Sequence, residues 1–135
     1  MNKSLTYKSA ERFLLSREFF GMKLGLENIR GFLEQVGNPQ NKYATIHVAG
    51  TNGKGSVCAM LASILTEAGY NTGLFTSPHL VDFRERVKIN GNKISKQSVI
   101  GFVRRHRTVL VKKNSRFSRL LQHWPLNSLL VAGLI

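Results

Sequence analysis

The chain has 135 residues, of which 20 are Lys or Arg and 7 are Asp or Glu, giving a formal net charge of +13 at pH 7. Its length suits one ordinary domain or part of a larger one, and its hydrophobic fraction of 42% excludes a fully disordered chain. A single cysteine, Cys58, excludes an internal disulfide and a multi-cysteine zinc site. No apolar run approaches the roughly 20 residues that span a bilayer and no signal-peptide pattern opens the chain, so we expect a cytoplasmic protein.

The first part of the chain predicts two helices followed by a strand. The helices are expected at residues 10–20 and 26–36, and residues 37–39 (Gly-Asn-Pro) end the second one. The second helix has an amphipathic stripe formed by Ile29, Phe32, Leu33 and Val36. Residues 43–48 then predict a short strand that is buried on both faces.

The middle of the chain predicts one βαβ unit. After the first strand, a helix is expected to begin near Gly55 and to end at Gly69, and residues 71–76 predict a second strand. Because crossovers of this kind are right-handed and join parallel strands, we expect the two strands to be parallel.

A hairpin and a further helix follow. Residues 86–94 alternate in polarity around Asn90 and Gly91, which predicts a hairpin with a tight primed turn. Ser95 is then expected to cap a helix that runs through residue 103.

The most informative motif is a glycine-rich run between the predicted strand and the predicted helix. It consists of Gly50, Thr51, Asn52, Gly53, Lys54, Gly55 and Ser56. Glycines allow consecutive backbone N–H groups to point into one concavity and bind phosphate oxygens, and the start of a helix adds the positive end of its dipole. Lys54 would place an ammonium near the phosphates, and a hydroxyl at the helix start can approach Mg²⁺.

The run departs from the general G-x-x-x-x-G-K-[ST] pattern of phosphate loops. Val48 and Ala49 stand where that pattern calls for glycine, and an extra glycine, Gly55, separates Lys54 from Ser56. A glycine-rich turn without a ligand is therefore an alternative. The coincidence of strand, loop, helix and a Gly-Lys pair favours a phosphate loop.

Four segments together resemble the N-terminal part of the folylpolyglutamate synthase family, some of whose members also act as dihydrofolate synthases. The segments are GMKLGLENI (21–29), HVAGTNGKGSV (47–57), TSPHL (76–80) and ERVKING (85–91). The family lies within the wider group of Mur ligases, and the resemblance covers residues 1 to about 103. It implies an α/β fold, the N-terminal part of a P-loop, parallel-sheet Mur-ligase-like ATPase domain, truncated and with a small β-hairpin.

The resemblance also implies a reaction. Members of this family use ATP and Mg²⁺ to join L-glutamate to the glutamate tail of a folate, through an acyl phosphate that the amine of glutamate attacks. Such phosphoryl transfer depends mostly on positioning and on neutralising charge. The implied partners are small molecules (folate, L-glutamate and ATP), with no nucleic acid and no membrane, and the intact enzyme is expected to be a monomer.

The resemblance assigns roles to particular residues. Residues 50–56 match the ATP-binding stretch, with Lys54 as the catalytic residue, and Ser77 matches the serine that ligates Mg²⁺. The region that helps hold the pteroate group of the folate is matched by Gly21, Met22, Lys23 and Leu24. For Lys23, an ordinary surface charge is an equal alternative.

Other residues have plainer alternatives. Ser77 precedes a proline and could simply shape a turn, and His79 is expected to be structural rather than catalytic. Arg84 and Arg86 could face folate carboxylates or belong to a solvated basic hairpin. Cys58 is expected to contribute to packing.

The C-terminal part departs from the family. Residues 104–135 carry seven basic and no acidic side chains, and they lack the family segment whose glutamate ligates Mg²⁺. We hypothesise a frameshift within residues 101–116, because the codons of His123, Trp124 and Pro125, read one base earlier, can give only Leu and Ala. The tail would then be out of frame and poorly ordered. Its charge would be an accident of the reading frame rather than a nucleic-acid footprint.

These observations predict a partial ATP-binding domain at residues 1–103 and a basic tail at residues 104–135. We expect this chain to be inactive as a ligase by itself. Two alternatives stay open: a catalytically dead nucleotide-binding remnant, such as a pseudogene product, and a basic nucleic-acid-binding protein.

Overall fold

A computed structural model describes residues 5–17, 27–112 and 129–133. The chain divides into two compact units, which are described separately. The first unit takes in residues 1–38 and 95–120, and the second takes in residues 39–94 and 121–135. None of the helices in the described ranges combines the length and the apolar character needed to cross a bilayer.

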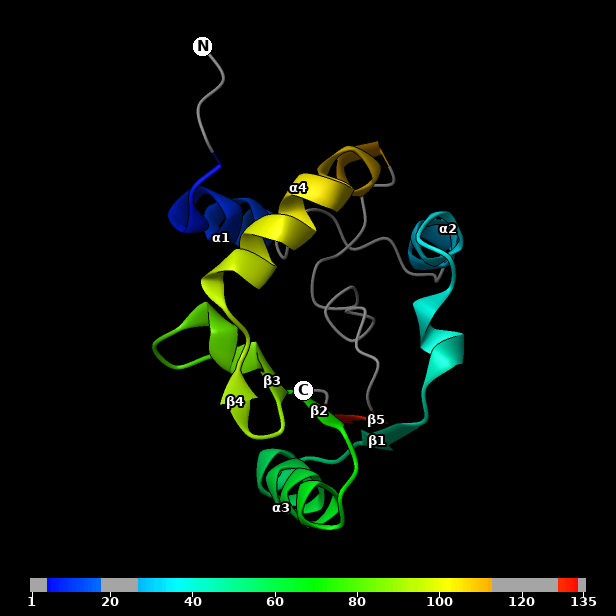
Figure 1. Cartoon of the computed structure of the whole chain (residues 1–135), viewed down its shortest axis with the longest axis vertical. Coiled ribbons are helices and arrows are strands. Elements are labelled where there is room, and N and C mark those ends of the chain that lie inside the picture. Colours follow the sequence, from blue (N-terminus) through cyan, green and yellow to red (C-terminus); the bar gives the residue numbers. More distant parts are fainter. Residues whose placement is uncertain (1–4, 18–26, 113–128, 134–135) are drawn as a thin grey trace. The chain divides into compact units, whose positions relative to one another are not determined.

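The first unit is helical. It contains α1 (Tyr7–Ser16), α2 (Glu27–Gln35) and α4 (Lys96–Lys112) (Figure 1). Two of these helices begin at side-chain caps. Before α1, the Thr6 hydroxyl accepts a hydrogen bond from the backbone N–H of Ser9, and before α4 the Ser95 hydroxyl accepts one from Ser98 at 3.0 Å. The predicted cap at Ser95 is confirmed.

Helix α4 is longer than its sequence pattern predicts. It was expected to end at residue 103, but it continues to Lys112 because its buried positions recur at helical spacing as far as Leu110. The core of this unit combines side chains from all three helices: Ala10, Leu14, Ile29, Phe32, Leu33, Val99, Phe102, Val103 and Leu110. The half-buried His106 ring and the Phe32 ring meet in a T-shaped arrangement at a centroid distance of 5.8 Å, which joins α2 to α4.

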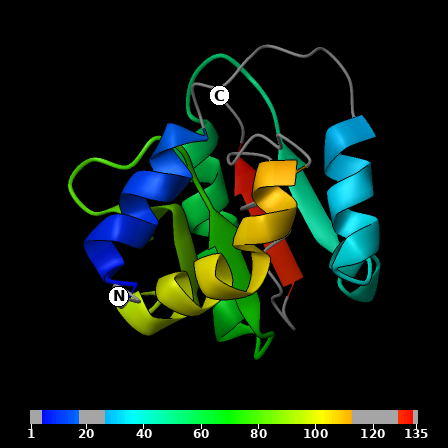
Figure 2. The same ribbon diagram turned by 90° about the horizontal axis from the view of Figure 1, so that it is seen from above.

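The second unit is a mixed sheet with one long helix. The strands are β1 (Thr45–Val48), β2 (Thr72–Phe75), β3 (Val87–Ile89), β4 (Asn92–Lys93) and β5 (Leu129–Gly133), in the spatial order β1-β5-β2-β3-β4. β5 is parallel to both β1 and β2, whereas β3 is antiparallel to β2 and to β4. Figure 2 shows β5 in red between β1 and β2. Helix α3 (Lys54–Glu67) packs on the parallel part of the sheet.

This arrangement confirms the α/β class, the parallel direction of the two expected strands and the hairpin. Asn90 and Gly91 both have positive φ, 47° and 78°, as a type I′ turn requires. Two short 3₁₀ helices, η1 (Pro39–Lys42) and η2 (Phe83–Arg86), complete the unit.

The burial predicted for the first strand is wrong. Ile46 and Val48 pack against a core cluster of Cys58, Ala62 and Leu74, but Thr45 and His47 are exposed. The physical reason is that β1 lies at the edge of the sheet in the described part of the chain, with Ile46 and Val48 on the face that packs against α3. Cys58 is fully buried in this cluster, in agreement with a packing role, and burial raises the pKa of its thiol.

The predicted boundary at residue 103 does not coincide with the end of an element. Residues 104–112 continue α4, and residues 129–133 form β5, a strand that the sequence did not predict. The frameshift is a statement about the nucleotide sequence, so it stays a hypothesis.

Candidate functional site

The predicted phosphate loop lies between the end of β1 and the start of α3. Gly53 is the N-cap of α3 in the left-handed conformation, with φ of 75°. The first backbone bond at this end of the helix runs from the N–H of Val57 to the carbonyl of Gly53, at 3.0 Å. The N–H groups of Lys54, Gly55 and Ser56 therefore precede the helical hydrogen-bond ladder, at the positive end of the helix dipole. The predicted position of this run, between a strand and a helix, is confirmed.

The N-terminus of α3 has neither a capping side chain nor a carboxylate in its first turn. Gly53 offers no capping side chain, and the first turn of α3 contains no acidic residue. Instead it begins with a cation, Lys54, although a positive charge at a helix N-terminus is unfavourable by about 0.3–1 kcal/mol. Binding of an anion would reverse that cost, since it would interact favourably with both the dipole and the ammonium.

The side chain of Lys54 folds back over the loop. Its Nζ donates hydrogen bonds to the carbonyl oxygens of Gly50 and of Thr51, the latter at 2.9 Å. An ammonium has three donors, so these two contacts fix its position and leave one N–H for a further acceptor. The surrounding loop residues are exposed and hence accessible to a ligand from solvent: Thr51, Asn52, Gly53, Gly55 and Ser56.

Ser77 lies at the same edge of the sheet as the loop. β1 and β2 are both parallel to β5, so the loop after β1 and the Ser77 segment after β2 follow strand ends that share one edge. The two strands are two spacings apart, about 10 Å. Open α/β sheets bind ligands at this carboxyl edge. Ser77 is half-buried.

The described residues do not form a Mg²⁺ site by themselves. Among them, no three His, Cys, Asp or Glu side chains come together as a metal-binding group. Mg²⁺ prefers six oxygen ligands, usually with one or two carboxylates. Ser77 would supply a single hydroxyl, while the nearby carboxylates of Asp82 and Glu85 already bind groups of their own segment. Any metal here would need further oxygens from a nucleotide and water.

Glu85 organises the segment that follows Ser77, and the sequence did not single it out. Its carboxylate accepts hydrogen bonds from the backbone N–H groups of Leu80 (3.0 Å), Val81 (3.4 Å) and Asp82 (3.1 Å). Lys93 lies 3.8 Å away. These groups, the N–H of Leu80 foremost, hold the pKa of Glu85 below its ordinary value. The Asp82-x-x-Glu85 spacing of a capping box is a sequence signal that could have indicated this role.

The two arginines of this segment bind within the protein. Arg86 is only 4% exposed, and its Nε donates to Nδ1 of His79 at 2.8 Å, beside the ring of Phe83. A solvated position is therefore wrong for Arg86, and His79 has a structural contact as expected. Arg84 contacts both carboxylate oxygens of Asp82, at 2.6–3.2 Å. Sequence patterns do not show such burial, because it depends on the fold of the segment.

The remaining predicted site residues, Gly21, Met22, Lys23 and Leu24, lie outside the described residues.

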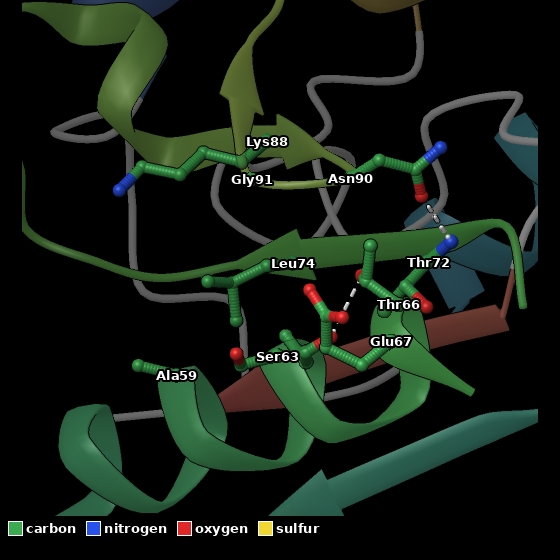
Figure 3. A pocket seen from close by; sticks show the side chains of 10 residues that line it. Ala59, Ser63, Thr66, Glu67, Thr72, Leu74, Lys88, Asn90 and Gly91 are labelled. Carbon is green, nitrogen blue, oxygen red and sulfur yellow. Dashed lines mark hydrogen bonds between the residues drawn. The ribbon is translucent and has the colours of Figure 1, made fainter. Parts of the chain in front are cut away.

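A cavity of about 300 Å³ lies away from the phosphate loop. Figure 3 shows it between α3 and the strands β2 and β3, with Ala59, Ser63 and Thr66 on the helix side. Its lining includes no residue of the loop. The loop, not this cavity, is the candidate site, because the loop combines N–H groups that precede the helical ladder with a lysine ammonium held by its carbonyls.

Proteins of known function are similar to this chain in sequence and in fold. The dihydrofolate synthase/folylpolyglutamate synthase of Bacillus subtilis is 45% identical over 89 residues, which are 66% of this chain and 21% of that protein. The apo form of L. casei FPGS superposes with a TM-score of 0.84 at 26% identity, covering 96% of this chain and 35% of that chain. In sequence and in fold, the chain matches part of a folylpolyglutamate synthase. Folylpolyglutamate synthase from Mycobacterium tuberculosis, solved with ADP and AMPPCP, gives a TM-score of 0.77 at 26% identity, covering 93% and 32% of the two chains.

The chain spans about a fifth of the Bacillus subtilis folylpolyglutamate synthase and about a third of the two solved ones. No protein-family model matches it. Its fold is thus that of part of a Mur-ligase-like folylpolyglutamate synthase.

Proposed function

We propose that residues 50–56 form the ATP-binding loop of a folylpolyglutamate synthase and that this 135-residue chain binds nucleotide without completing the ligation. The observation that carries the proposal is the loop geometry: three N–H groups ahead of the α3 ladder, with the Lys54 ammonium held beside them. The complexes of the Mycobacterium tuberculosis relative with ADP and AMPPCP support a nucleotide as the ligand.

In the complete reaction, ATP would phosphorylate the terminal carboxylate of a folate's glutamate tail, and the amine of L-glutamate would then displace phosphate to form an amide. The N–H groups and Lys54 would bind and orient the phosphates and neutralise their charge. Mg²⁺ would supply further charge neutralisation when bound with the nucleotide, and Ser77 would be one of its oxygen ligands. Gly21, Met22, Lys23 and Leu24 remain proposed contacts of the folate. A cytoplasmic location and a monomeric state remain expectations as well.

The proposal is tested by measuring ATP binding to the 135-residue protein by isothermal titration calorimetry. Lys54→Ala should lower the affinity at least tenfold, because it removes the only cation that contacts the loop carbonyls in the described structure. Lys112→Ala removes an exposed lysine at the end of α4 and is the matched control. Equal affinities for wild type and Lys54→Ala, or no binding by a folded wild type, would contradict the proposal.

Nucleotide binding without ligation also describes a catalytically dead remnant. The two descriptions differ in whether the chain regains activity when the rest of a ligase is supplied. Recovery of glutamate transfer in such a mixture would favour a ligase part, and its absence, with ATP binding intact, would favour the remnant.

A further inference from the structure

The cavity beside α3 carries opposite charges on its two sides. Glu67 and Ser63 line it from the helix, and Lys88 lines it from β3. Figure 3 shows the carboxylate of Glu67 directed toward the hairpin, while the side chain of Lys88 extends along its strand and away from Glu67. The cavity volume of about 300 Å³ is that of a small-molecule site.

The two charges have no partner inside the protein. Within the described ranges, neither Glu67 nor Lys88 forms an ion pair, and the hydroxyl of Ser63 forms no hydrogen bond. Glu67 is exposed, but Lys88 is half-buried, and removing an ammonium from water is unfavourable unless an anion replaces the water. The cavity therefore holds one carboxylate and one ammonium that are both available to a ligand.

The rest of the lining is already fixed in place. Thr66 Oγ1 donates a hydrogen bond to the carbonyl of Ala62 at 2.8 Å, and the N–H of Thr72 donates to Oδ1 of Asn90 at 2.8 Å. Because the Thr66 hydroxyl has used its only hydrogen, it can only accept a bond from a ligand. Ala62 and Leu74 belong to the buried core cluster and give the cavity an apolar floor. A lining that is held before binding lowers the entropy that binding costs.

These walls define the chemical class of the ligand. A molecule that satisfies both charges carries an ammonium for Glu67 and a carboxylate for Lys88, and such charge-assisted hydrogen bonds are the stronger kind. The free hydroxyl of Ser63 suits a small polar side chain. A second carboxylate, as in L-glutamate, would find no second cation, because Lys88 is the one cation among the described residues that line the cavity.

We propose that this cavity binds a small, neutral α-amino acid in its zwitterionic form, and L-serine is the probe that matches its groups. The ammonium of L-serine would donate to Glu67, its carboxylate would accept from Lys88, and its hydroxyl would contact Ser63 and Thr66. The site shares no residue with the phosphate loop, so the inference goes beyond nucleotide binding and can fail independently of it.

The test is an NMR titration of the ¹⁵N-labelled 135-residue chain with L-serine. The amides of residues 63, 67 and 88 should shift and saturate in the millimolar range, while those of residues 50–56 should stay in place. Propionate and ethanolamine each carry only one of the two charges, and L-glutamate carries an extra carboxylate. All three should bind at least about fivefold more weakly than L-serine.

Variants of the two charged residues give a second test. Lys88→Met and Glu67→Gln should each weaken the binding of L-serine at least about fivefold, whereas Lys88→Arg, which keeps the charge, should bind more tightly than Lys88→Met. Lys42→Met and Glu34→Gln change exposed charges outside the cavity, so these matched controls should bind as the wild type does. Thermal denaturation checks that each variant is folded.

Three results would overturn the proposal. The first is a folded wild type whose amides at residues 63, 67 and 88 show no saturable shift with L-serine. The second is unchanged affinity in both Lys88→Met and Glu67→Gln. The third is binding of propionate or L-glutamate as tight as that of L-serine, which would show that the net positive charge of the chain attracts the ligand and that the paired walls do not select it.

Discussion

Gly53 and Gly55 lack a side chain for different reasons. Gly53 has a φ of 75°, a conformation that costs residues with a Cβ roughly 1–2 kcal/mol. Gly55 lies in the first turn of α3 without a positive φ, and a Cβ added there would meet no atom within 4 Å. The folded chain therefore requires glycine at position 53 but not at 55. Close approach of a phosphate to the backbone would explain the second glycine.

This distinction gives a prediction for Gly55→Ala. The free energy of unfolding should stay the same or rise by up to about 1 kcal/mol, because alanine is the better helix former. The affinity for ATP should nevertheless fall at least tenfold, because the methyl group would occupy the space near the phosphates. Urea denaturation and calorimetry measure the two quantities on the same sample. Unchanged affinity would show that no phosphate approaches residue 55. Gly53→Ala, by contrast, should lower the free energy of unfolding, because residue 53 has a positive φ.

The lowered pKa of Glu85 predicts how the stability of the fold changes at acid pH. Its pKa lies below the ordinary value because three backbone N–H groups, led by that of Leu80, bind its charged form. A group whose pKa is lower in the folded state stabilises the fold above its unfolded pKa, and this contribution is lost as the pH falls through the folded value. The wild type should therefore lose more stability than Glu85→Gln does as the pH falls below 4.5, the ordinary pKa of a glutamate side chain.

The measurement for Glu85 is urea denaturation across the acid range. Glu11→Gln, which changes a half-buried carboxylate on α1, is the control and should keep the wild-type acid dependence. Identical acid dependence of wild type and Glu85→Gln would show that the three N–H contacts do not hold the 80–82 backbone in solution.

At the scale of elements, the sequence predicted the helices and turns that depend on residues close together in the chain. The hairpin follows from Asn90 and Gly91, which tolerate positive φ, and α3 follows from apolar spacing and a glycine stop. The burial of β1 could not be predicted in this way, because it depends on strand order. The same holds for β5, which takes its place between β1 and β2 through pairing with residues more than 50 positions away.

In the candidate site, too, the sequence predicted what depends on neighbouring residues and not what depends on the folded arrangement. The sequence indicated Lys54 and its neighbours because a phosphate loop is a continuous motif. It contained no sign that Arg86 is buried, because the partners His79 and Phe83 approach it only once the segment has folded. Charge in a sequence predicts exposure only on average, and a hydrogen-bonded arginine is an exception.

The packing of α2 against α4 should depend on pH through His106. Burial, helped by Arg105, lowers the pKa of His106 below its ordinary value of 6.5. The unfolded chain then binds a proton more readily than the folded one, so stability falls as the pH drops below about 6.5. Thermal melting from pH 7.5 to about 5 should show a decline in the wild type that His106→Gln reduces. His47→Gln, at an exposed position, should leave it unchanged, and an equal decline in all three proteins would exclude His106 as the cause.

At the scale of the whole molecule, the uneven charge has two competing explanations. Seven of the basic residues and none of the acidic ones lie in residues 104–135. Under the frameshift hypothesis, the DNA after about codon 100 should encode a continuation of the ligase in a neighbouring reading frame, including the glutamate that ligates the metal in the family. Reading that DNA in three frames is the measurement. If no neighbouring frame continues the ligase, the tail belongs to the protein, and a salt-dependent affinity for nucleic acid would then explain its charge.

The ability to bind nucleotide and the ability to ligate should separate in this molecule. The described residues include N–H groups ahead of the α3 ladder and the Lys54 ammonium, which we propose bind the phosphates, but they contain no cluster of three His, Cys, Asp or Glu side chains suited to a metal, and the chain covers about a third of the solved relatives. Purified 135-residue protein, given ATP, Mg²⁺, tetrahydrofolate and labelled L-glutamate, should therefore incorporate no label into folate. An intact folylpolyglutamate synthase is the positive control, and the Lys54→Ala variant sets the background. Incorporation above that background would show that the phosphate loop and its neighbouring strands suffice for the reaction.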